Sequence, residues 1–491
     1  MNIYRDAEQF MISNPKKGSL QTRIFDASNQ KKMKSNPKQI YALVSSTLKY
    51  KPFLQHIIKK SHLLKLEKKS KLTESMALLL VHDLLFTKSG RIQSRQHPLK
   101  DAIIRNKTRL QAELTKLKLK HGVKSLDDLI EDDYTPVRWF RANLIKTTKE
   151  QLLKEFSHLT QVYKLDDIKQ GTIYHDEYIP NLFGMHPKDK LTSTDAYLKG
   201  RVIIQDRASC FPAYILNPTP RKDKVIDACS APGNKTTHLA SILQNTPDSI
   251  IAFEKDEKRV KILKMMCDKA GGLKCISIQH GDFTTTNPMD YPEITGLVVD
   301  PSCSGSGIFG RAIDKNVQAE ESNGGEDSEN GGDYDEERLK KLSNFQFTIV
   351  KHAMSFPNAR KLVYSTCSIH AQENERVAVD LMLDEQVKKQ GWRICDRAEV
   401  IPNWPRRGFV EEFSALPDPE KCAGGCVRSL PKVDGGIGFF AVAFERDVVG
   451  LETKENGSSK KNAKEANTMK KVNTKKETAP KKKTIIKKSI T

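Results

Sequence analysis

Two cysteines, Cys303 and Cys367, stand 64 positions apart in loops rich in small residues. Cys303 follows the apolar residues 294–299, and Cys367 follows residues 361–364. Both apolar stretches are typical of parallel strands. Parallel α/β sheets gather their chemistry just past the carboxyl ends of the strands. Two thiols in such places predict covalent catalysis in which each cysteine has its own task.

A second group of small residues forms the turn between Asp227 and Thr236. It has neither the glycine spacing of a dinucleotide-binding turn nor that of a P-loop. Small residues let the backbone approach a ligand at the start of the following helix. Glu254 comes 21 residues after Gly233, where an acidic side chain holds ribose hydroxyls in nucleotide-binding folds. One ribose to hold and no diphosphate cradle favour S-adenosylmethionine over NAD or ATP.

Four carboxylates follow successive predicted strands, and this joint spacing supports a single site. They are Asp227, Glu254, Asp282 and Asp300, with Asp282 placed to meet an adenine edge. Lys235 either orders the cofactor turn and its carboxylates or is exposed to solvent, and the same alternatives hold for Arg259. The predicted cofactor-binding residues are Cys229, Ser230, Ala231, Pro232, Gly233, Asn234, Lys235, Glu254, Arg259, Asp282 and Asp300.

The elements that must position these residues alternate between strand and helix from about residue 201. Strands are predicted at 225–227, 250–254, 276–278, 294–299, 361–364 and 438–444, and helices at 236–243, 257–270 and 345–354. Alternating strands and helices predict an α/β class fold, with a mostly parallel, doubly wound sheet.

Length and charge limit the remaining possibilities. A chain of 491 residues is long enough for two or three domains. No apolar stretch reaches the length of a membrane span, and the N-terminus lacks the apolar core of a signal peptide. The nine cysteines are expected to be reduced, and Cys422 and Cys426 lack a second ligand pair, so no metal site is predicted. A net charge of +21 favours a nucleic-acid partner.

Composition divides the chain into four parts. Residues 1–131 are predicted to be a helical, basic domain, either a bundle with a solvated lysine face or an RNA-contacting module. Residues 132–200 are expected to form a small α/β subdomain, and residues 201–446 the sheet domain. An acidic, unstructured insertion is predicted at about 318–337. The lysine-rich tail, 447–491, suits nuclear targeting, an RNA tether or a merely solvated charge run.

Three segments together resemble the Nop/Sun family of RNA cytosine-C5 methyltransferases. They are residues 227–236, 300–307 and 365–369, supported by the runs at 138–143 and 205–209. The helical N-terminal region, with the runs 35–44 and 50–53, is similar to the branch that modifies large-subunit rRNA (25S in fungi, 28S in animals). Family members often have Asp-x-Pro-Cys in the loop where this chain has Asp300-Pro301-Ser302-Cys303, which keeps the spacing from Asp to Cys.

The resemblance implies a role for each catalytic residue. Cys367 would be the nucleophile that adds to cytosine C6, which makes C5 reactive toward a methyl sulfonium. Cys303 would act later, when the C5 proton leaves and the enzyme–RNA bond breaks. DNA cytosine methyltransferases use the cysteine of the Pro-Cys loop instead, so chemistry alone does not assign the two roles. Asp300 would hydrogen-bond the N3/N4 edge of the cytosine and also contact the cofactor.

The target base must leave its stack to reach both thiols, which implies a single-stranded or opened RNA segment. Candidate stacking or phosphate partners are Tyr364, Trp404, Arg406 and Arg407, with core packing as the alternative for the aromatic residues. The expected partner is large-subunit rRNA in a pre-ribosome, met in the nucleus and nucleolus by a monomeric enzyme. A tRNA methyltransferase and a ribosome-assembly factor that mainly binds are the rival interpretations.

Overall fold

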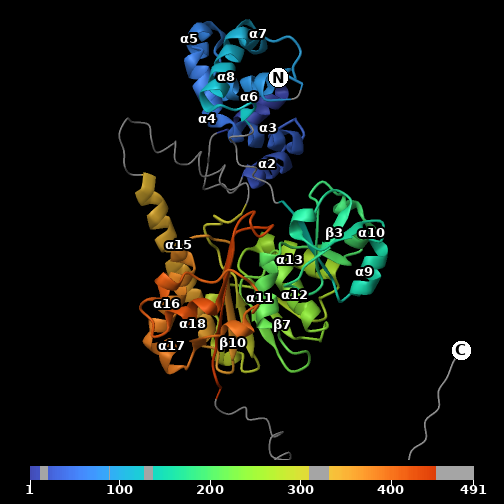
Figure 1. Cartoon of the computed structure of the whole chain (residues 1–491), viewed down its shortest axis with the longest axis vertical. Helices are drawn as coiled ribbons and strands as arrows, with labels where there is room; N and C mark the ends of the chain where they lie inside the picture. The colour runs from blue at the N-terminus through green and yellow to red at the C-terminus, as the bar shows by residue number, and fades with distance from the viewer. Residues whose placement is uncertain (12–19, 88, 127–135, 309–330, 449–491) are drawn as a thin grey trace, which may run out of the picture. The chain divides into compact units, whose positions relative to one another are not determined.

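The computed structural model of the chain describes residues 1–11, 20–87, 89–126, 136–308 and 331–448. It contains a helical N-terminal region, a five-stranded sheet and an eight-stranded sheet flanked by helices (Figure 1). The predicted fold class is therefore confirmed. No helix in the described ranges is long and apolar enough to cross a bilayer. The part of the lysine-rich tail from residue 449 onward lies outside the described residues.

The N-terminal region is built from helices that bury one apolar side in a common core. Its buried side chains include Ile40, Leu54, Ile57, Leu79 and Ile103. The helices are α1 (Asn2–Glu8), α2 (Leu20–Asn29), α3 (Pro37–Lys49), α4 (Lys51–Lys60), α5 (Leu63–Leu66), α6 (Glu74–Leu85), α7 (Pro98–Arg105) and α8 (Lys107–His121).

Local sequence explains where several of these helices begin and end. The Asn36 side chain accepts a hydrogen bond from the Lys38 amide at the start of α3, with Pro37 at the first helical position. The Thr73 side chain caps α6 in the same way through the Met76 amide. Gly122 ends α8 in the left-handed conformation, with φ of +67°.

The smaller sheet lies between residues 138 and 204. Its strands are β1 (Arg138–Ala142), β2 (Thr160–Val162), β3 (Thr172–His175), β4 (Leu182–Met185) and β5 (Val202–Ile204), in the order β2-β3-β4-β1-β5. Helices α9 (Lys149–Glu155) and α10 (Asp195–Leu198) accompany it. Because β5 pairs antiparallel with β1, the predicted boundary at residue 200 falls one strand too early.

The larger sheet has the order β11-β13-β10-β9-β6-β7-β8, with β12 paired to β13. The run from β10 to β8 is parallel, and β13 pairs antiparallel with β10, β11 and β12. Its strands are β6 (Val225–Asp227), β7 (Ile250–Glu254), β8 (Ile276–His280), β9 (Gly296–Val299), β10 (Lys361–Thr366), β11 (Arg393–Ile394), β12 (Cys426–Ser429) and β13 (Phe439–Glu445).

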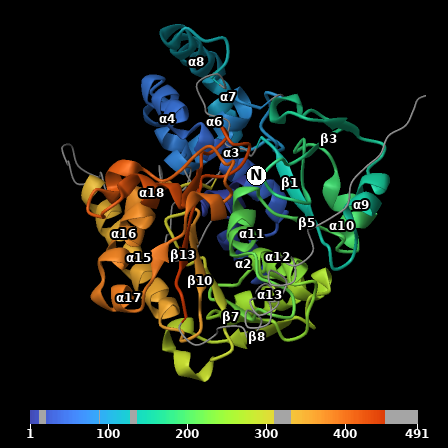
Figure 2. The ribbon, with the colours of Figure 1, turned by 60° about the horizontal axis from the view of Figure 1, so that its bottom comes forward.

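Helices cover both faces of the larger sheet, as a doubly wound fold requires. Neighbouring residues of one strand enter opposite cores: Val298 packs in the cluster with α11 to α13, and Val299 packs in the cluster with α15 to α18. The two helix groups lie on opposite sides of the sheet in Figure 2. The helices are α11 (Phe211–Leu216), α12 (Asn234–Ile242), α13 (Glu257–Ala270), α15 (Gly331–Met354), α16 (Glu375–Leu383), α17 (Glu385–Lys389) and α18 (Pro419–Gly424).

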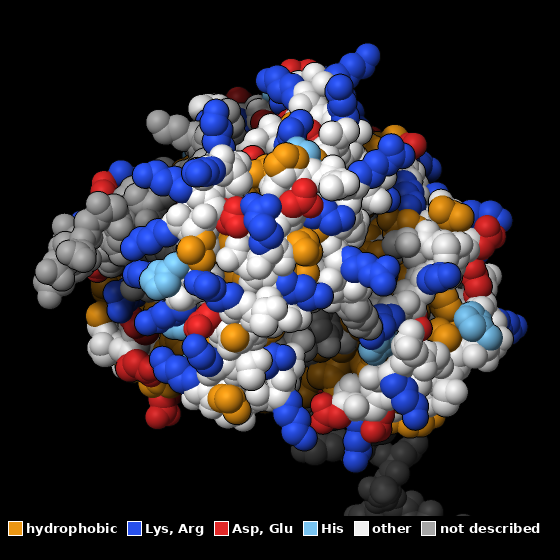
Figure 3. All heavy atoms as spheres, turned by 90° about the horizontal axis from the view of Figure 1, so that it is seen from above, with side chains coloured by type: hydrophobic (Ala, Val, Ile, Leu, Met, Phe, Trp, Pro, Cys, Tyr) orange, Lys and Arg blue, Asp and Glu red, His pale blue; other side chains and the backbone are white. Residues whose placement is uncertain are grey.

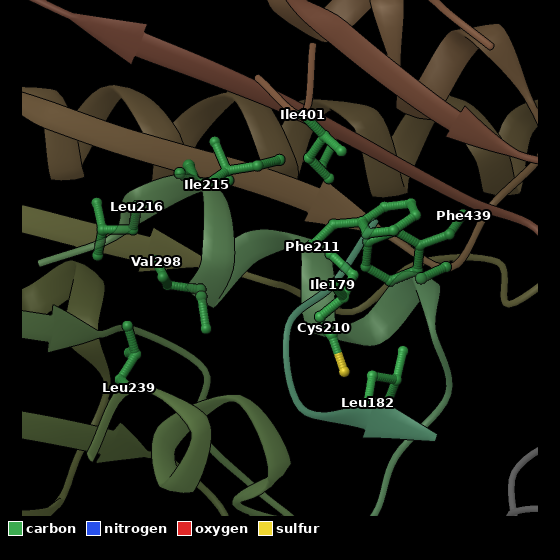
Figure 4. Close-up of a cluster of buried hydrophobic side chains, with 14 of the residues drawn as sticks. Ile179, Leu182, Cys210, Phe211, Ile215, Leu216, Leu239, Val298, Ile401 and Phe439 are labelled. Carbon is green, nitrogen blue, oxygen red and sulfur yellow. The ribbon is translucent and has the colours of Figure 1, made fainter. Parts of the chain in front are cut away.

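The smaller sheet and the larger sheet share one hydrophobic core. Phe211 of α11 lies in this cluster with Leu182 of β4 and Phe439 of β13 (Figure 4). The Trp139 indole of β1 also donates a 2.8 Å hydrogen bond to the Gly435 carbonyl. The smaller sheet thus packs against the larger sheet through a shared core.

The predicted acidic insertion requires a correction. Residues 318–330 lie outside the described residues, but 331–337 form the first turns of α15. Glu337 pairs with Lys341 one turn later, at 2.7 Å, and glutamate and lysine are good helix formers. The acidic composition therefore reflects the start of a helix as well as an insertion.

Candidate active site

The two predicted catalytic cysteines lie side by side at one edge of the larger sheet. β9 and β10 are parallel neighbours, so the loops that follow them leave from the same edge. The Sγ atoms of Cys303 and Cys367 are 3.0 Å apart, within hydrogen-bonding distance for sulfur. Neither thiol is in a disulfide, and both side chains are half-buried. The structure therefore brings together residues 64 positions apart in the sequence.

Three serine hydroxyls tie the two cysteine loops together. Ser304 and Ser306 of the first loop both hydrogen-bond Ser368 of the second loop, at 3.2 and 3.1 Å. The Gly307 amide also donates to the Cys367 carbonyl at 3.0 Å. A side chain at Gly307 would place its Cβ 2.2 Å from the Gly438 carbonyl oxygen, so only glycine fits. The separation of the two thiols is thus fixed by surrounding backbone.

A buried carboxylate that sequence reasoning missed supports the Cys303 loop. Glu373 accepts hydrogen bonds on Oε1 from the Ser304 amide at 2.8 Å and from Gln346 Nε2 at 3.0 Å. Gln346 also donates to the Ser302 carbonyl at 3.0 Å, so the two side chains hold both sides of Cys303. Among the described residues, Glu373 Oε2 has no hydrogen-bond partner. The available signal was the polar run 372–375 just after the second cysteine loop.

The surroundings of Cys303 raise the pKa of its thiol well above the usual range. The main cause is the hydrogen bond with Cys367, followed by burial and by the negative charges of Asp300 and Glu373. Cys303 therefore keeps its proton at neutral pH, and either sulfur can be the donor in the hydrogen bond between the two thiols.

Asp300 and Lys235 form an ion pair beside the two thiols. Lys235 Nζ lies 2.7 Å from Asp300 Oδ2, and the Ser365 hydroxyl donates to Asp300 Oδ1 at 2.6 Å. Burial by itself would lower the pKa of the Lys235 ammonium, but Asp300 and, to a smaller extent, Cys367 raise it above its usual value. Lys235 thus remains charged next to the predicted nucleophile.

A cavity of about 960 Å³ opens beside the cysteines and extends across the carboxyl ends of β6 to β9. Such a volume is enough for a nucleoside-sized ligand. Its walls combine the turn after β6, the ends of β7 and β8, and both cysteine loops. The lining residues include Cys229, Ala231, Pro232, Glu254, Arg259, Asp282, Phe283, Asp300, Cys303, Phe345 and Cys367.

The carboxylates of the cavity are held by local contacts. Glu254 accepts the Asp256 amide on Oε1 at 2.9 Å and lies 3.4 Å from the Arg259 guanidinium. Arg259 also donates to the Ala231 carbonyl at 2.6 Å, which links α13 to the turn after β6. Hydrogen bonds from Lys255 and then Thr284 lower the pKa of Asp282. Arg259 therefore orders the turn and its carboxylate, although half of its side chain is exposed.

Four predicted cofactor residues are absent from the lining of this cavity. The Ser230 hydroxyl donates to the Asp227 carbonyl and closes the turn at 2.8 Å. Gly233 caps α12 with φ of +109°, a conformation that favours glycine. The Asn234 carbonyl accepts from Arg141, and Lys235 pairs with Asp300 instead. These residues shape the turn and stay predictions as cofactor contacts.

The predicted RNA-stacking residues require a second correction. Tyr364 and Trp404 are buried in the hydrophobic cores, so neither ring can stack on a base. Arg406 pairs with Asp434 at 2.8 Å, and Arg407 donates to backbone carbonyls, at 2.6 Å for that of Ile401. The alternative of core packing is therefore right for both aromatic side chains.

A doubly wound sheet with a nucleoside-sized cavity at the carboxyl ends of its strands defines the Rossmann-like class of nucleotide-binding folds. A solved structure called PH0851 supports this fold, with a TM-score of 0.56 at 18% identity over 91% of this chain and 98% of its own. The family model for the N-terminal domain of NOL1/NOP2/Sun domain family member 5 matches residues 38–130. The model for 16S rRNA methyltransferase RsmB/F matches residues 213–444.

Curated relatives agree with these matches over almost the whole chain. The 25S rRNA (cytosine-C(5))-methyltransferase rcm1 of Schizosaccharomyces pombe is 41% identical over 90% of this chain and 90% of its own length. The 28S rRNA (cytosine-C(5))-methyltransferase of Mus musculus is 35% identical over 91% of each. The chain therefore belongs to the Nop/Sun family of RNA cytosine-C5 methyltransferases, and the resemblance predicted from the sequence is confirmed.

Proposed function

We propose that this chain methylates C5 of a cytosine in large-subunit rRNA, with S-adenosylmethionine as the methyl donor. The observation that carries the proposal is the pair of thiols 3.0 Å apart at the cofactor cavity. The similarity to named 25S and 28S rRNA enzymes supports rRNA over tRNA as the substrate. Ribosome assembly would place the enzyme in the nucleus and nucleolus, where we expect it to act as a monomer.

The residues of the cavity fit S-adenosylmethionine. Glu254 presents a buried carboxylate that suits the two ribose hydroxyls, and Asp282 lies at the next strand end, where an adenine edge would be met. Cys229, Ala231 and Pro232 leave room for a ligand close to the backbone before α12. When bound, the cofactor supplies an electrophilic methyl group.

The first chemical step uses Cys367. Its thiolate forms a bond to cytosine C6, and the electron pair of the C5–C6 double bond shifts toward C4 as the C4–N3 pair moves onto N3, which makes C5 enamine-like. Asp300 hydrogen-bonds the N3/N4 edge and stabilises the ring in this activated form, while Lys235 balances the local negative charge. C5 then carries the electron density that the methyl group accepts.

The second step uses Cys303. The C5 proton passes to the ionised Cys303 sulfur, the C5–C6 double bond re-forms, and the C6–sulfur bond breaks, so that Cys367 leaves as a thiolate. The largest cause of the raised pKa of Cys303 is its hydrogen bond with Cys367, and that bond weakens once the Cys367 sulfur carries the base. Cys303 becomes easier to ionise at that stage, which supports its action late in the cycle.

Transfer of labelled methyl groups tests the proposal directly. Purified full-length protein is incubated with methyl-labelled S-adenosylmethionine and unmodified large-subunit rRNA, and the RNA is digested to nucleosides. We expect label in 5-methylcytidine, and bisulfite sequencing should show one unconverted cytosine that is converted when the gene is deleted. Label in tRNA alone, or none in 5-methylcytidine, would refute the proposed substrate.

A further inference from the structure

The positive charge of the chain is concentrated in its N-terminal helical region. Residues 20–126 contain 24 lysines and arginines against six aspartates and glutamates, a net charge of +18. The described residues of the two sheet regions, 136–308 and 331–448, contain 40 lysines and arginines against 38 aspartates and glutamates. Blue lysine and arginine side chains are also common on the face shown in Figure 3. Because their charges nearly cancel, the two sheet regions offer little net attraction for an RNA backbone.

One face of the N-terminal region carries a hollow bordered by these cations. α4 is amphipathic: Leu54, Ile57 and Ile58 pack into the helical core, and Lys59 and Lys60 are exposed. The hollow between α4, α5 and α6 has a volume of about 610 Å³. It is lined by Gln55, His56, Ile58, Lys59, His62, Leu64, Lys65 and Glu74.

The segment around this hollow is rich in lysine and poor in carboxylates. Residues 59–71 contain six lysines and a single carboxylate, Glu67. Arg105 and Asn106 already hydrogen-bond that carboxylate, through Arg105 Nη2 at 2.6 Å and Asn106 Nδ2 at 2.9 Å. Within the described ranges, neither Lys59 nor Lys65 forms an ion pair.

The hollow also has groups that could meet a nucleotide directly. Glu74 is its one carboxylate, and Gln55 Nε2 donates to it at 3.3 Å, which lessens its repulsion of an anion. His56 and His62 line the hollow together with Lys59 and Lys65, and an imidazole offers a flat ring and ring nitrogens to a base. Cations beside aromatic faces are the usual combination for a single-stranded or looped RNA backbone.

We propose that this hollow is an RNA-backbone site that anchors the substrate by a segment distinct from the one carrying the target cytosine. Lys59 and Lys65 would each contact a phosphate, and His56 and His62 would pack against an adjacent base. The proposal rests on the proposed function for the identity of the RNA. It assigns affinity to the helical region and chemistry to the thiol site.

The test compares two double variants of the full-length protein with equal charge changes. Lys59→Glu/Lys65→Glu alters the hollow, and Lys31→Glu/Lys32→Glu alters exposed lysines after α2 that do not line it. Binding to a long rRNA fragment is measured by filter retention between about 50 and 200 mM salt. Two lost phosphate contacts should reduce the slope of log affinity against log salt by roughly 1.4 to 1.8 and weaken binding by about tenfold or more.

The control variant should weaken binding less than about threefold, and both variants should keep the wild-type melting temperature and adduct formation on a short hairpin at saturating concentration. Equal losses in the two variants would overturn the hollow as a specific site. Unchanged rRNA affinity in the hollow variant would also overturn it and would favour an acidic protein as its partner. An inactive wild-type enzyme would instead contradict the proposed function.

Discussion

The helical N-terminal region and the thiol site, which contains Cys303, Cys367, Asp300 and Lys235, differ in how their charged side chains are arranged. The helical region has many exposed cations, and the thiol site has paired charges. The first has 24 lysines and arginines against six acidic residues, and many of the described cations, such as Lys59 and Lys60, are exposed, so any ligand contact is spread over many groups. In the second, each charged group has a defined partner, such as Asp300 with Lys235 at 2.7 Å. RNA affinity that comes from many dispersed cations changes little when one of them is substituted. The rate of a reaction that depends on a fixed geometry falls sharply when one of its groups is substituted. The comparison predicts larger losses of activity from single substitutions at the thiol site than in the helical region.

The largest effect is expected from Cys367→Ala. Removal of the nucleophile should lower kcat by roughly 10³-fold or more, because the raised pKa of Cys303 keeps its thiol protonated and unable to replace the lost thiolate. Cys422→Ala is the matched control, since its half-buried thiol lies outside the cavity lining. Activity of Cys367→Ala within tenfold of wild type would remove covalent catalysis by this residue.

A smaller loss is expected from Asp300→Asn. The substitution keeps the shape but removes the negative charge that pairs with Lys235 and stabilises the activated ring. We expect kcat to fall by about 10²-fold, with the Kd for a long rRNA fragment within threefold of wild type. If affinity fell and kcat did not, the division between chemistry and binding would be wrong.

Glu373→Gln should change the pH dependence of Cys303 alkylation more than it changes the rate of methyl transfer. The Glu373 charge is one of the causes that raise the pKa of Cys303, so its loss should lower that pKa. Iodoacetamide alkylation of Cys303, followed by mass spectrometry against pH, should shift to lower pH by about half a unit or more. Glu373→Ala, which also loses the Ser304 hydrogen bond, is the disruptive comparison. An unchanged profile in the Gln variant would limit Glu373 to structural support.

The smallest effect is expected from Thr73→Ala in the helical region. The variant loses the cap of α6 and should lower the free energy of unfolding by about 1 kcal/mol. Urea unfolding monitored by circular dichroism measures this change. Methyl transfer to a short hairpin should be unaffected, and a large catalytic loss would show that the two regions are coupled.

Long local patterns were predictable, and contacts between distant segments were not. β7 and α13 match their predictions residue for residue, because an apolar run ends at Glu254 and Asp256 caps the helix that Gly271 ends. The short strands β11 and β12 were missed, since each depends on pairing with β13.

The same distinction applies to the site. The approach of Cys303 and Cys367 followed from their places after two parallel strands, so the sequence was enough to predict it. Glu373 was not predicted, because its role depends on a backbone amide 69 positions earlier. Burial of Trp404 was equally hidden, since a tryptophan followed by a proline and two arginines can lie on the surface or in a core.

The central claim is that the two thiols act in sequence, Cys367 first and Cys303 later. The most direct test incubates each alanine variant with rRNA and S-adenosylmethionine and separates the products on a denaturing gel. We expect Cys303→Ala to accumulate a denaturant-stable protein–RNA adduct that contains 5-methylcytosine, and Cys367→Ala to form none. An adduct in Cys367→Ala and its absence in Cys303→Ala would contradict this order and exchange the two roles.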